Sequence, residues 1–138
     1  MTGMVIDASV ALSWVYTDQA TPQTEKLLTD VENGVPIVVP VLWFTEVANG
    51  LLILQRRKKL IAKDRITALQ KLESLNILSD EESGRAAFSA GSRHAEKHGL
   101  TVYDATYLEV ALRRALPLAT RDIALQKAAR AAGIEVLS

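Results

Sequence analysis

The chain has 138 residues, 49% of them hydrophobic, and its 16 basic residues balance 16 acidic ones to a formal net charge of zero. This length suits a single domain over residues 1–138 with a core of its own, and the net charge argues neither for nor against a nucleic-acid partner. With no cysteine in the chain, disulfides and thiolate metal sites are excluded and a cytoplasmic location is expected; no apolar run is long enough to span a membrane.

Short apolar segments alternate with helical periodicity along the whole chain. In chain order we expect a strand at Met4–Asp7, a helix at Pro22–Val31, a strand at Val35–Val39 and a strongly apolar helix at Val41–Leu54. Next come a helix at Asp64–Leu75, a short strand at Asn76–Ser79 and a helix at Ser83–Lys97. The last elements are a helix at Thr101–Ala115, a strand at Pro117–Ala119, a helix at Arg121–Ala132 and a strand at Ile134–Leu137.

This alternation predicts the fold class. Strands that are apolar throughout and separated by helices are typical of an α/β fold with a parallel sheet covered by helices on both faces. In such sheets, ligands bind outside the carboxyl ends of the strands. The residues that follow each strand are therefore the first candidates for a functional site.

Acidic residues lie near three of these strand ends. Asp7 closes the first strand, Glu46 lies in the helix after the second, and Asp122 comes just after the strand at 117–119. Asp104 does not follow a strand directly. It lies in the first turn of its helix, which can still point to the same end of the sheet.

Three of these acids also have a structural interpretation, because they suit the start of a helix. Asp7 could cap a helix at Ala8–Val15. Asp104 could complete a capping box with Thr101. Asp122 could lie at a helix start capped by the threonine two residues before it. For Asp104 and Asp122 taken singly this interpretation is the simpler one, and for Asp7 both stay open.

Glu46 is harder to explain as a structural residue. In the apolar helix it forms a narrow polar stripe with Asn49 and Gly50, at spacings i, i+3 and i+4. The stripe could face water, or it could line a polar cleft. In the second case, a glycine beside the carboxylate leaves room for a ligand.

Four carboxylates at one end of a sheet repel each other and stay ionised together only with a cation. Hard oxygen ligands with open positions suit Mg²⁺, with Mn²⁺ as a substitute, better than zinc. The sequence thus predicts Asp7, Glu46, Asp104 and Asp122 as metal ligands and catalytic residues. The expected chemistry is hydrolysis of a phosphodiester by metal-activated water. One or two ions are equally compatible with the pattern.

Four segments together resemble the PIN-domain ribonucleases, and most closely the VapC-type toxins of bacterial toxin–antitoxin pairs. They are Val5–Ser9, Glu46–Leu51, Tyr103–Leu108 and Leu118–Asp122 with Leu125 after it. The resemblance implies a three-layer α/β/α sandwich with a parallel sheet of about four to five strands, and the same four acids as the site. It also implies that Ser9 and Thr120 orient carboxylates or water, and Asn49 of the polar stripe is a further supporting candidate.

The resemblance also implies a substrate and partners. Family members cut RNA and are silenced by a cognate antitoxin protein that occupies the site. The excess of apolar residues in 41–54 favours a homodimer or a partner over that helix. The alternative is a catalytically inactive PIN-like module that only binds RNA or a protein, and the intact set of acids argues against it.

Basic residues outside the acids are weaker candidates. Arg56 and Arg57, in a basic run at 56–59, and Arg121, next to Asp122, could contact RNA or simply be solvated. His94 and His98 have the i, i+4 spacing of a zinc pair, but no third ligand is evident nearby. We therefore expect them to be surface histidines.

Overall fold

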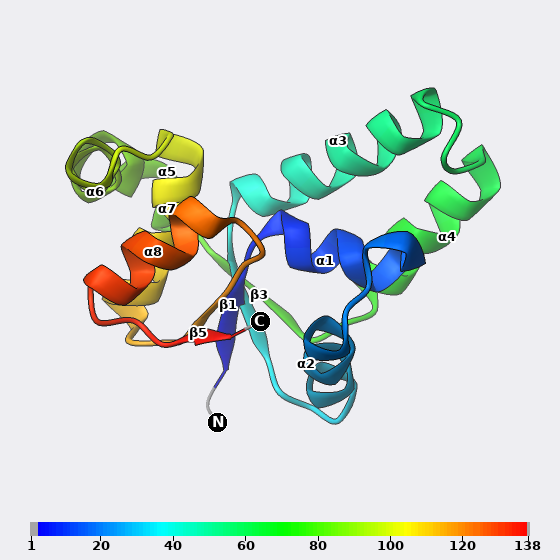
Figure 1. The fold of residues 1–138 in the computed structure, drawn as a ribbon, viewed down its shortest axis with the longest axis horizontal. Coiled ribbons are helices and arrows are strands. Elements are labelled where there is room, and N and C mark those ends of the chain that lie inside the picture. Colours follow the sequence, from blue (N-terminus) through cyan, green and yellow to red (C-terminus); the bar gives the residue numbers. More distant parts are fainter. Residues whose placement is uncertain (1–2, 138) are drawn as a thin grey trace.

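The computed structural model describes residues 3–137, which form a five-stranded sheet between two groups of helices (Figure 1). The strands are β1 (Met4–Ile6), β2 (Ile37–Pro40), β3 (Ile77–Asp80), β4 (Leu118–Ala119) and β5 (Val136–Leu137). Each strand runs parallel to its neighbours, in the order β3-β2-β1-β4-β5. The predicted α/β fold with a parallel sheet of four to five strands is confirmed.

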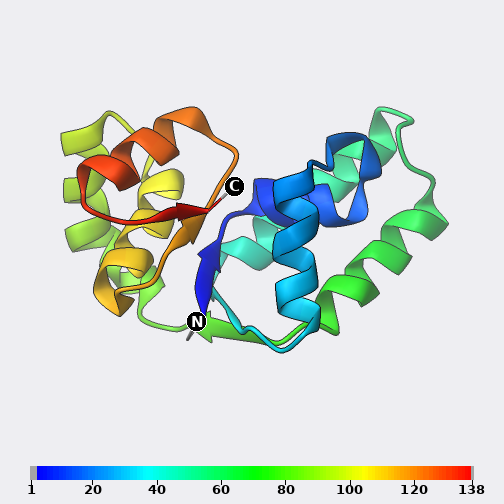
Figure 2. The same cartoon turned by 60° about the horizontal axis from the view of Figure 1, so that its bottom comes forward.

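The helices of the two halves of the chain cover opposite faces of the sheet (Figures 1 and 2). One face carries α1 (Ala8–Val15), α2 (Pro22–Glu32), α3 (Leu42–Arg56) and α4 (Ala62–Glu73), with the 3-10 turn η1 (Thr17–Gln19). The other carries α5 (Ser83–Ala86), α6 (Ser92–His98), α7 (Val102–Arg114) and α8 (Ile123–Ala131), with the π-helical turn η2 (Ala87–Gly91). The three layers form the predicted α/β/α sandwich.

The strand order places a topological switch point between β1 and β4. The chain moves outward from β1 to β2 and β3, then returns to the other side of β1 to form β4 and β5. Val5 pairs with Leu118 and Ile6 with Ala119, so these two strands end at the same level. Ligands of open α/β sheets bind at such a point, and here Asp7 and Asp122 follow the two strands that flank it.

Helix α7 forms the main contact of one helical layer with the sheet. It packs against β1 and β2, and its residues from Ala105 to Ala111 are all buried. The strands β1 and β2 are buried throughout, which accounts for their lack of apolar–polar alternation. The amino end of α7, with Asp104 in its first turn, is thereby fixed to the rigid centre of the molecule.

Two predicted elements differ in detail from the structure. The expected helix Ser83–Lys97 is interrupted by the π-helical turn η2, where the Ser92 hydroxyl donates to the Ala87 carbonyl at 2.5 Å. The helix predicted to begin at Arg121 begins at Ile123, because Asp122 itself is the N-cap. Within the described residues, no helix is both long enough and apolar enough to cross a membrane.

Candidate active site

Asp7 lies directly after β1 and is held by three hydrogen bonds. Its Oδ1 accepts from the Ser9 hydroxyl at 2.6 Å and from the Val10 amide at 3.2 Å, and its Oδ2 accepts from the Thr120 hydroxyl. The bond from Val10 makes Asp7 the N-cap of α1, so the structural interpretation of this residue holds alongside any functional one. The side chain is buried, and its orientation is fixed from both sides.

The loop after β4 is joined to Asp7 through two hydroxyl groups. The Arg121 amide donates to the Ser9 hydroxyl at 3.1 Å, and the Asp122 amide donates to the Thr120 hydroxyl at 3.0 Å. Each hydroxyl in turn donates to one oxygen of Asp7. This arrangement joins the backbone of the loop that bears Asp122 to Asp7, and the hydroxyls of Ser9 and Thr120 fix the orientation of the Asp7 carboxylate.

Asp122 and Asp104 both lie at helix starts. Asp122 accepts from the Leu125 amide at 2.8 Å and caps α8, which corrects the expectation that the threonine before it is the cap. Thr101 caps α7 by accepting from the Asp104 amide at 3.1 Å. Among the described residues, no hydrogen bond from the Thr101 amide to the Asp104 carboxylate completes the predicted box. The Asp104 carboxylate nevertheless interacts with Thr101, through a side-chain hydrogen bond that lowers its pKa against the larger rise caused by burial.

Glu46 enters the site from α3 and is held by Tyr107, a residue to which sequence analysis assigned no role in the site. The Tyr107 hydroxyl donates to Glu46 Oε1 at 2.5 Å, and the ring of Tyr107 is buried in the core. Tyr107 and Asp104 lie three residues apart on one side of α7. This i, i+3 spacing is the signal that could have linked Tyr107 to the acids.

The four carboxylates interact electrostatically. Burial raises the pKa of Asp7, and Asp104 adds to the rise, against hydrogen bonds that lower it. Burial likewise raises the pKa of Glu46, with further contributions from Asp104 and Asp7. The pKa of Asp104 is raised by burial and then by Asp122. The four acids thus form one chain of mutual repulsion at the switch point of the sheet.

The described part of the chain supplies no cation that pairs with this cluster. None of the ion pairs between described residues involves Asp7, Glu46, Asp104 or Asp122. Within residues 3–137, no three His, Cys, Asp or Glu side chains converge closely enough to hold a metal ion directly. Mg²⁺ keeps several waters and needs only one or two carboxylates. The donor set therefore fits Mg²⁺ with intervening water, and it does not fit a closed zinc site.

The polar stripe of α3 is only partly what was expected. Gly50 faces α1, and a Cβ on it would lie 2.7 Å from Leu12 Cδ1. This glycine therefore permits the close approach of two helices and does not widen a cleft. Glu46 and Asn49 do line a hollow of about 360 Å³, together with Leu42, Thr45 and Tyr103.

Another acid at a strand end belongs to a different environment. Asp80 ends β3, and its buried carboxylate accepts from Arg113 at 2.8 and 3.0 Å and from Arg114. Arg113 also pairs with Glu109 at 2.7 Å. Burial acts to raise the pKa of Asp80, but the hydrogen bonds from the two arginines outweigh it and lower the pKa. Asp80 is thus a neutralised structural acid.

The remaining polar candidates lie apart from one another. Arg56 and Arg57 are exposed at the end of α3, about 15 Å along the helix from Glu46 at 1.5 Å per residue. Arg121 is exposed, and its guanidinium donates to the Gln19 carbonyl at 2.6 Å. The rings of His94 and His98 lie 6.4 Å apart on α6, and no described residues complete a metal site with them.

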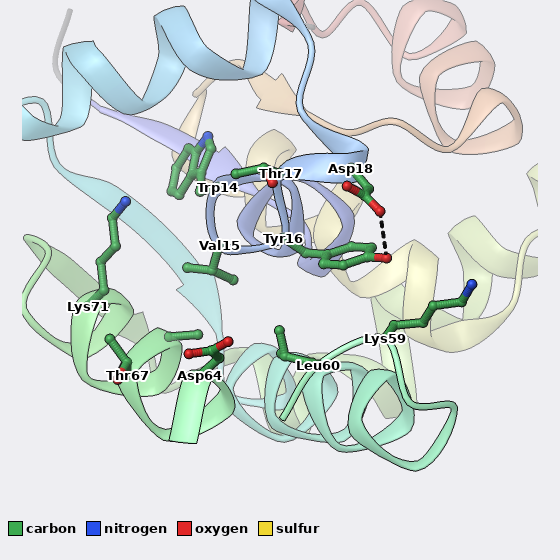
Figure 3. Close-up of a pocket in the computed structure, with 11 residues that line it drawn as sticks. Trp14, Val15, Tyr16, Thr17, Asp18, Lys59, Leu60, Asp64, Thr67 and Lys71 are labelled. Atoms are coloured by element: carbon green, nitrogen blue, oxygen red, sulfur yellow. Dashed lines mark hydrogen bonds between the residues drawn. The ribbon is translucent and has the colours of Figure 1, made fainter. Parts of the chain in front are cut away.

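A cavity of about 520 Å³ between α1, η1 and α4 is lined by none of the four acids. Figure 3 shows Trp14 and Asp18 on one wall and Asp64 and Lys71 on the other. The Tyr16 hydroxyl donates to Asp18 on the same side of the cavity at 3.0 Å. Its charged side chains have both signs, so it lacks the purely acidic character of the cluster at the switch point.

Comparison with known proteins gives a consistent result. The family model described as PIN domain matches residues 4–131. A Pyrobaculum aerophilum protein matches with a TM-score of 0.70 and 24% identity, over 98% of this chain and 83% of that one. FitAcB from Neisseria gonorrhoeae matches with a TM-score of 0.66 and 20% identity, over 98% of this chain and 96% of that one. A member of the VapBC family of toxin–antitoxin systems from Mycobacterium tuberculosis matches with a TM-score of 0.60 and 21% identity, over 99% of this chain and 98% of that one. No curated protein matches the chain.

Proposed function

This chain belongs to the PIN-domain family, and we propose that it is a Mg²⁺-dependent endoribonuclease, the toxin of a toxin–antitoxin pair. One observation carries the proposal. Electrostatic interactions connect Asp7, Glu46 and Asp104 with one another and Asp122 with Asp104, and none of the four pairs with a cation among the described residues. Such a cluster is costly for the fold unless a cation binds there.

The chemistry follows from how the acids are held. Asp7 has the most constrained carboxylate and is our choice for the central metal ligand, with Asp104 and Asp122 beside it and Glu46 binding directly or through water. A bound Mg²⁺, or Mn²⁺ in its place, would lower the pKa of a water molecule and neutralise charge on the phosphate. Because water attacks and the ribose 2′-hydroxyl does not, no cyclic phosphate forms. With the 3′-oxygen as the leaving group, the products carry a 5′-phosphate and a 3′-hydroxyl.

Cationic side chains near the acids would hold the RNA. Arg121 keeps N–H groups beyond the one that bonds Gln19, and it lies at the start of the loop that bears Asp122. Arg56 and Arg57 have no ion pair among the described residues and could bind phosphates farther along the strand. These contacts position the backbone without reading the sequence.

Partners follow from the same surfaces. A cognate antitoxin with an arginine at the site would pair with the carboxylates and displace metal and substrate together. We also propose a homodimer in the cytoplasm, through exposed apolar side chains of the helices, such as Val41, Phe44 and Phe88. The side chain of Phe88 is 96% exposed, and a large aromatic group in this state suggests an interface.

The activity is tested by incubating purified protein with total cellular RNA in Mg²⁺, Mn²⁺, Zn²⁺ or EDTA and mapping the ends of the fragments. We expect cleavage in Mg²⁺ and Mn²⁺, none in EDTA, and 5′-phosphate ends. Binding without cleavage in any metal would support the alternative, an inactive module that binds RNA or protein. Activity in Zn²⁺ alone would contradict the argument from hard oxygen ligands.

The toxin role is tested in a bacterial cell. Expression of the protein alone should arrest growth, the Asp104→Ala variant at the same level should not, and co-expression with the adjacent small open reading frame should restore growth. Unimpaired growth with the wild-type protein, at a level confirmed by immunoblot, would refute the toxin role and leave the nuclease proposal standing.

A further inference from the structure

A hollow beside Glu46 has no part in the chemistry described so far. It measures about 360 Å³ and is lined by Leu42, Thr45, Glu46, Asn49 and Tyr103; we call it the Tyr103 pocket. Its size is at the lower end of the range for small-molecule sites. Tyr103 directly precedes Asp104 in α7, and Glu46 itself forms part of the wall. A group in this pocket therefore lies next to the acidic cluster.

The lining of the Tyr103 pocket combines a free aromatic ring with free hydrogen-bonding groups. Tyr103 is 67% exposed. In the described part of the chain, neither its hydroxyl nor the Thr45 hydroxyl nor the Asn49 amide makes a hydrogen bond. Large exposed aromatic rings of this kind are stacking surfaces in proteins that bind single-stranded RNA. The amide of asparagine can both donate to and accept from the edge of a base.

The charge of the side chains that line the Tyr103 pocket favours a nucleobase over a phosphate. Glu46 is its one ionisable side chain besides Tyr103, and no described lysine or arginine borders it. A phosphate would meet a carboxylate here without a compensating cation. A nucleobase is neutral and planar, with a face that can stack and an edge that can exchange hydrogen bonds. The pocket suits the base and leaves the phosphates to Arg121 and to the Mg²⁺ that the acidic cluster would hold.

Resting on the proposed function, we propose that the Tyr103 pocket binds one unstacked nucleobase of the RNA, next to the phosphate that is cut. Tyr103 stacks on the base, Asn49 and Thr45 bond its edge, and Leu42 packs against it. Tyr103 and Asn49 are then specificity-determining residues. The nuclease cuts preferentially beside a base that matches the donors and acceptors of Asn49.

The binding test separates this proposal from catalysis. Fluorescently labelled single-stranded RNA hexamers of A, C or U are titrated in Mg²⁺ buffer with Asp7→Asn protein, which is expected to leave them intact. Tyr103→Ala, Tyr103→Phe and Asn49→Ala are then added to this background. Tyr16→Ala is the matched control, because Tyr16 lies in the separate cavity between α1 and α4; circular dichroism verifies that every variant folds.

A stacked base contributes enough that its loss is easily measured. Tyr103→Ala should weaken binding roughly 5- to 150-fold, while Tyr103→Phe, which keeps the stacking face, should stay within about twofold of the parent. Asn49→Ala should reduce the differences in affinity among the three hexamers, and Tyr16→Ala should change nothing. Unchanged affinity of Tyr103→Ala, or an equal loss in Tyr103→Phe, overturns the proposal. So does a Tyr103→Ala variant whose only change is its oligomeric state, because a second copy of the chain then covers the pocket.

A cleavage test with the active protein distinguishes the two levels of inference. A random-sequence RNA is cut and the ends are sequenced. Wild type should show a base preference beside the cut, and Tyr103→Ala and Asn49→Ala should lose it, with the Mg²⁺ concentration for half-maximal activity unchanged. The same base preference in both variants overturns the pocket. Failure of wild type to cut any RNA overturns the proposed function, and the hexamer titration then judges the pocket by itself.

Discussion

Two groups of carboxylates in this protein differ in what surrounds them. Asp80 and Glu109 share Arg113, and Arg114 completes the charge balance of Asp80. At the switch point, the four acids have hydroxyl and amide donors but no cation among the described residues. The pKa of Asp80 is lowered despite its burial, whereas burial and neighbouring acids raise the pKa of Asp7. The first group stabilises the fold, and the second is a site for a cation from solution.

Loss of one site carboxylate should have the largest effect. Asp7→Asn keeps the shape of the side chain: Ser9 and Val10 can still donate to the remaining oxygen, and the Thr120 hydroxyl can rotate to accept from the new NH2 group. Cleavage should fall at least about 10³-fold, or about 4 kcal/mol of barrier, without loss of the folded state. Initial rates on RNA and circular dichroism measure the two effects. Full activity in the folded variant would show that Asp7 is not a metal ligand.

Loss of a cation from the structural group should act on stability. Arg113→Met leaves Asp80 with Arg114 alone and leaves Glu109 without its partner. Unfolding free energy should fall by about 3 kcal/mol, the low end for a broken buried pair, because Arg113 is partly exposed. Urea titration measures this. The control Lys26→Met removes the exposed pair with Asp30 and should cost less than about 0.5 kcal/mol; an equal loss in both would erase the distinction between buried and exposed pairs.

Much of this contrast could not be read from the sequence, since it depends on residues far apart along the chain. The strand-end rule placed Asp7 and Asp122 correctly, because the strands they follow are apolar and adjacent in the sheet. The same rule cannot exclude Asp80 from the candidate metal ligands, because its partner Arg113 lies 33 residues later in the chain. The bond between Tyr107 and Glu46 spans 61 residues. Nothing in the sequence pattern showed which group the Tyr107 hydroxyl would meet.

Tyr107 is expected to tune the site without touching the substrate. Tyr107→Phe keeps the buried ring and removes the hydrogen bond that fixes one oxygen of Glu46. The Mg²⁺ concentration for half-maximal activity should rise about 10-fold, the usual lower bound for loss of a residue that orients a ligand, and saturating Mg²⁺ should restore most of the rate. Calorimetric titration with Mn²⁺ gives an independent reading. Unchanged metal affinity would show that Tyr107 contributes only to packing and does not orient Glu46 for metal binding.

The pH dependence of the unfolding free energy should also differ between the site acids and Asp80, but by a smaller amount. Acids whose pKa is raised in the folded state, such as Asp7 and Asp104, contribute stability below their ordinary pKa of 3.8, and it is lost as pH rises through the folded value. Asp80, with a lowered pKa, contributes stability above 3.8 that is lost as pH falls through the folded value. In EDTA, wild type should therefore weaken as pH rises from about 4, and Asp7→Asn should weaken less. Urea unfolding at several pH values checks the slopes; identical slopes would contradict the assigned shifts.

The central claim is that the acids at the switch point destabilise the free protein and that a divalent cation reverses this. The most direct measurement is the melting temperature of wild type and Asp7→Asn at pH 8, in EDTA and across a Mg²⁺ titration. In EDTA, the variant should melt at the higher temperature, because one repulsive charge is gone. Mg²⁺ should raise the melting temperature of wild type, through binding to the folded state, and should raise that of the variant much less. Equal melting temperatures in EDTA and an equal response of both proteins to Mg²⁺ would contradict the account.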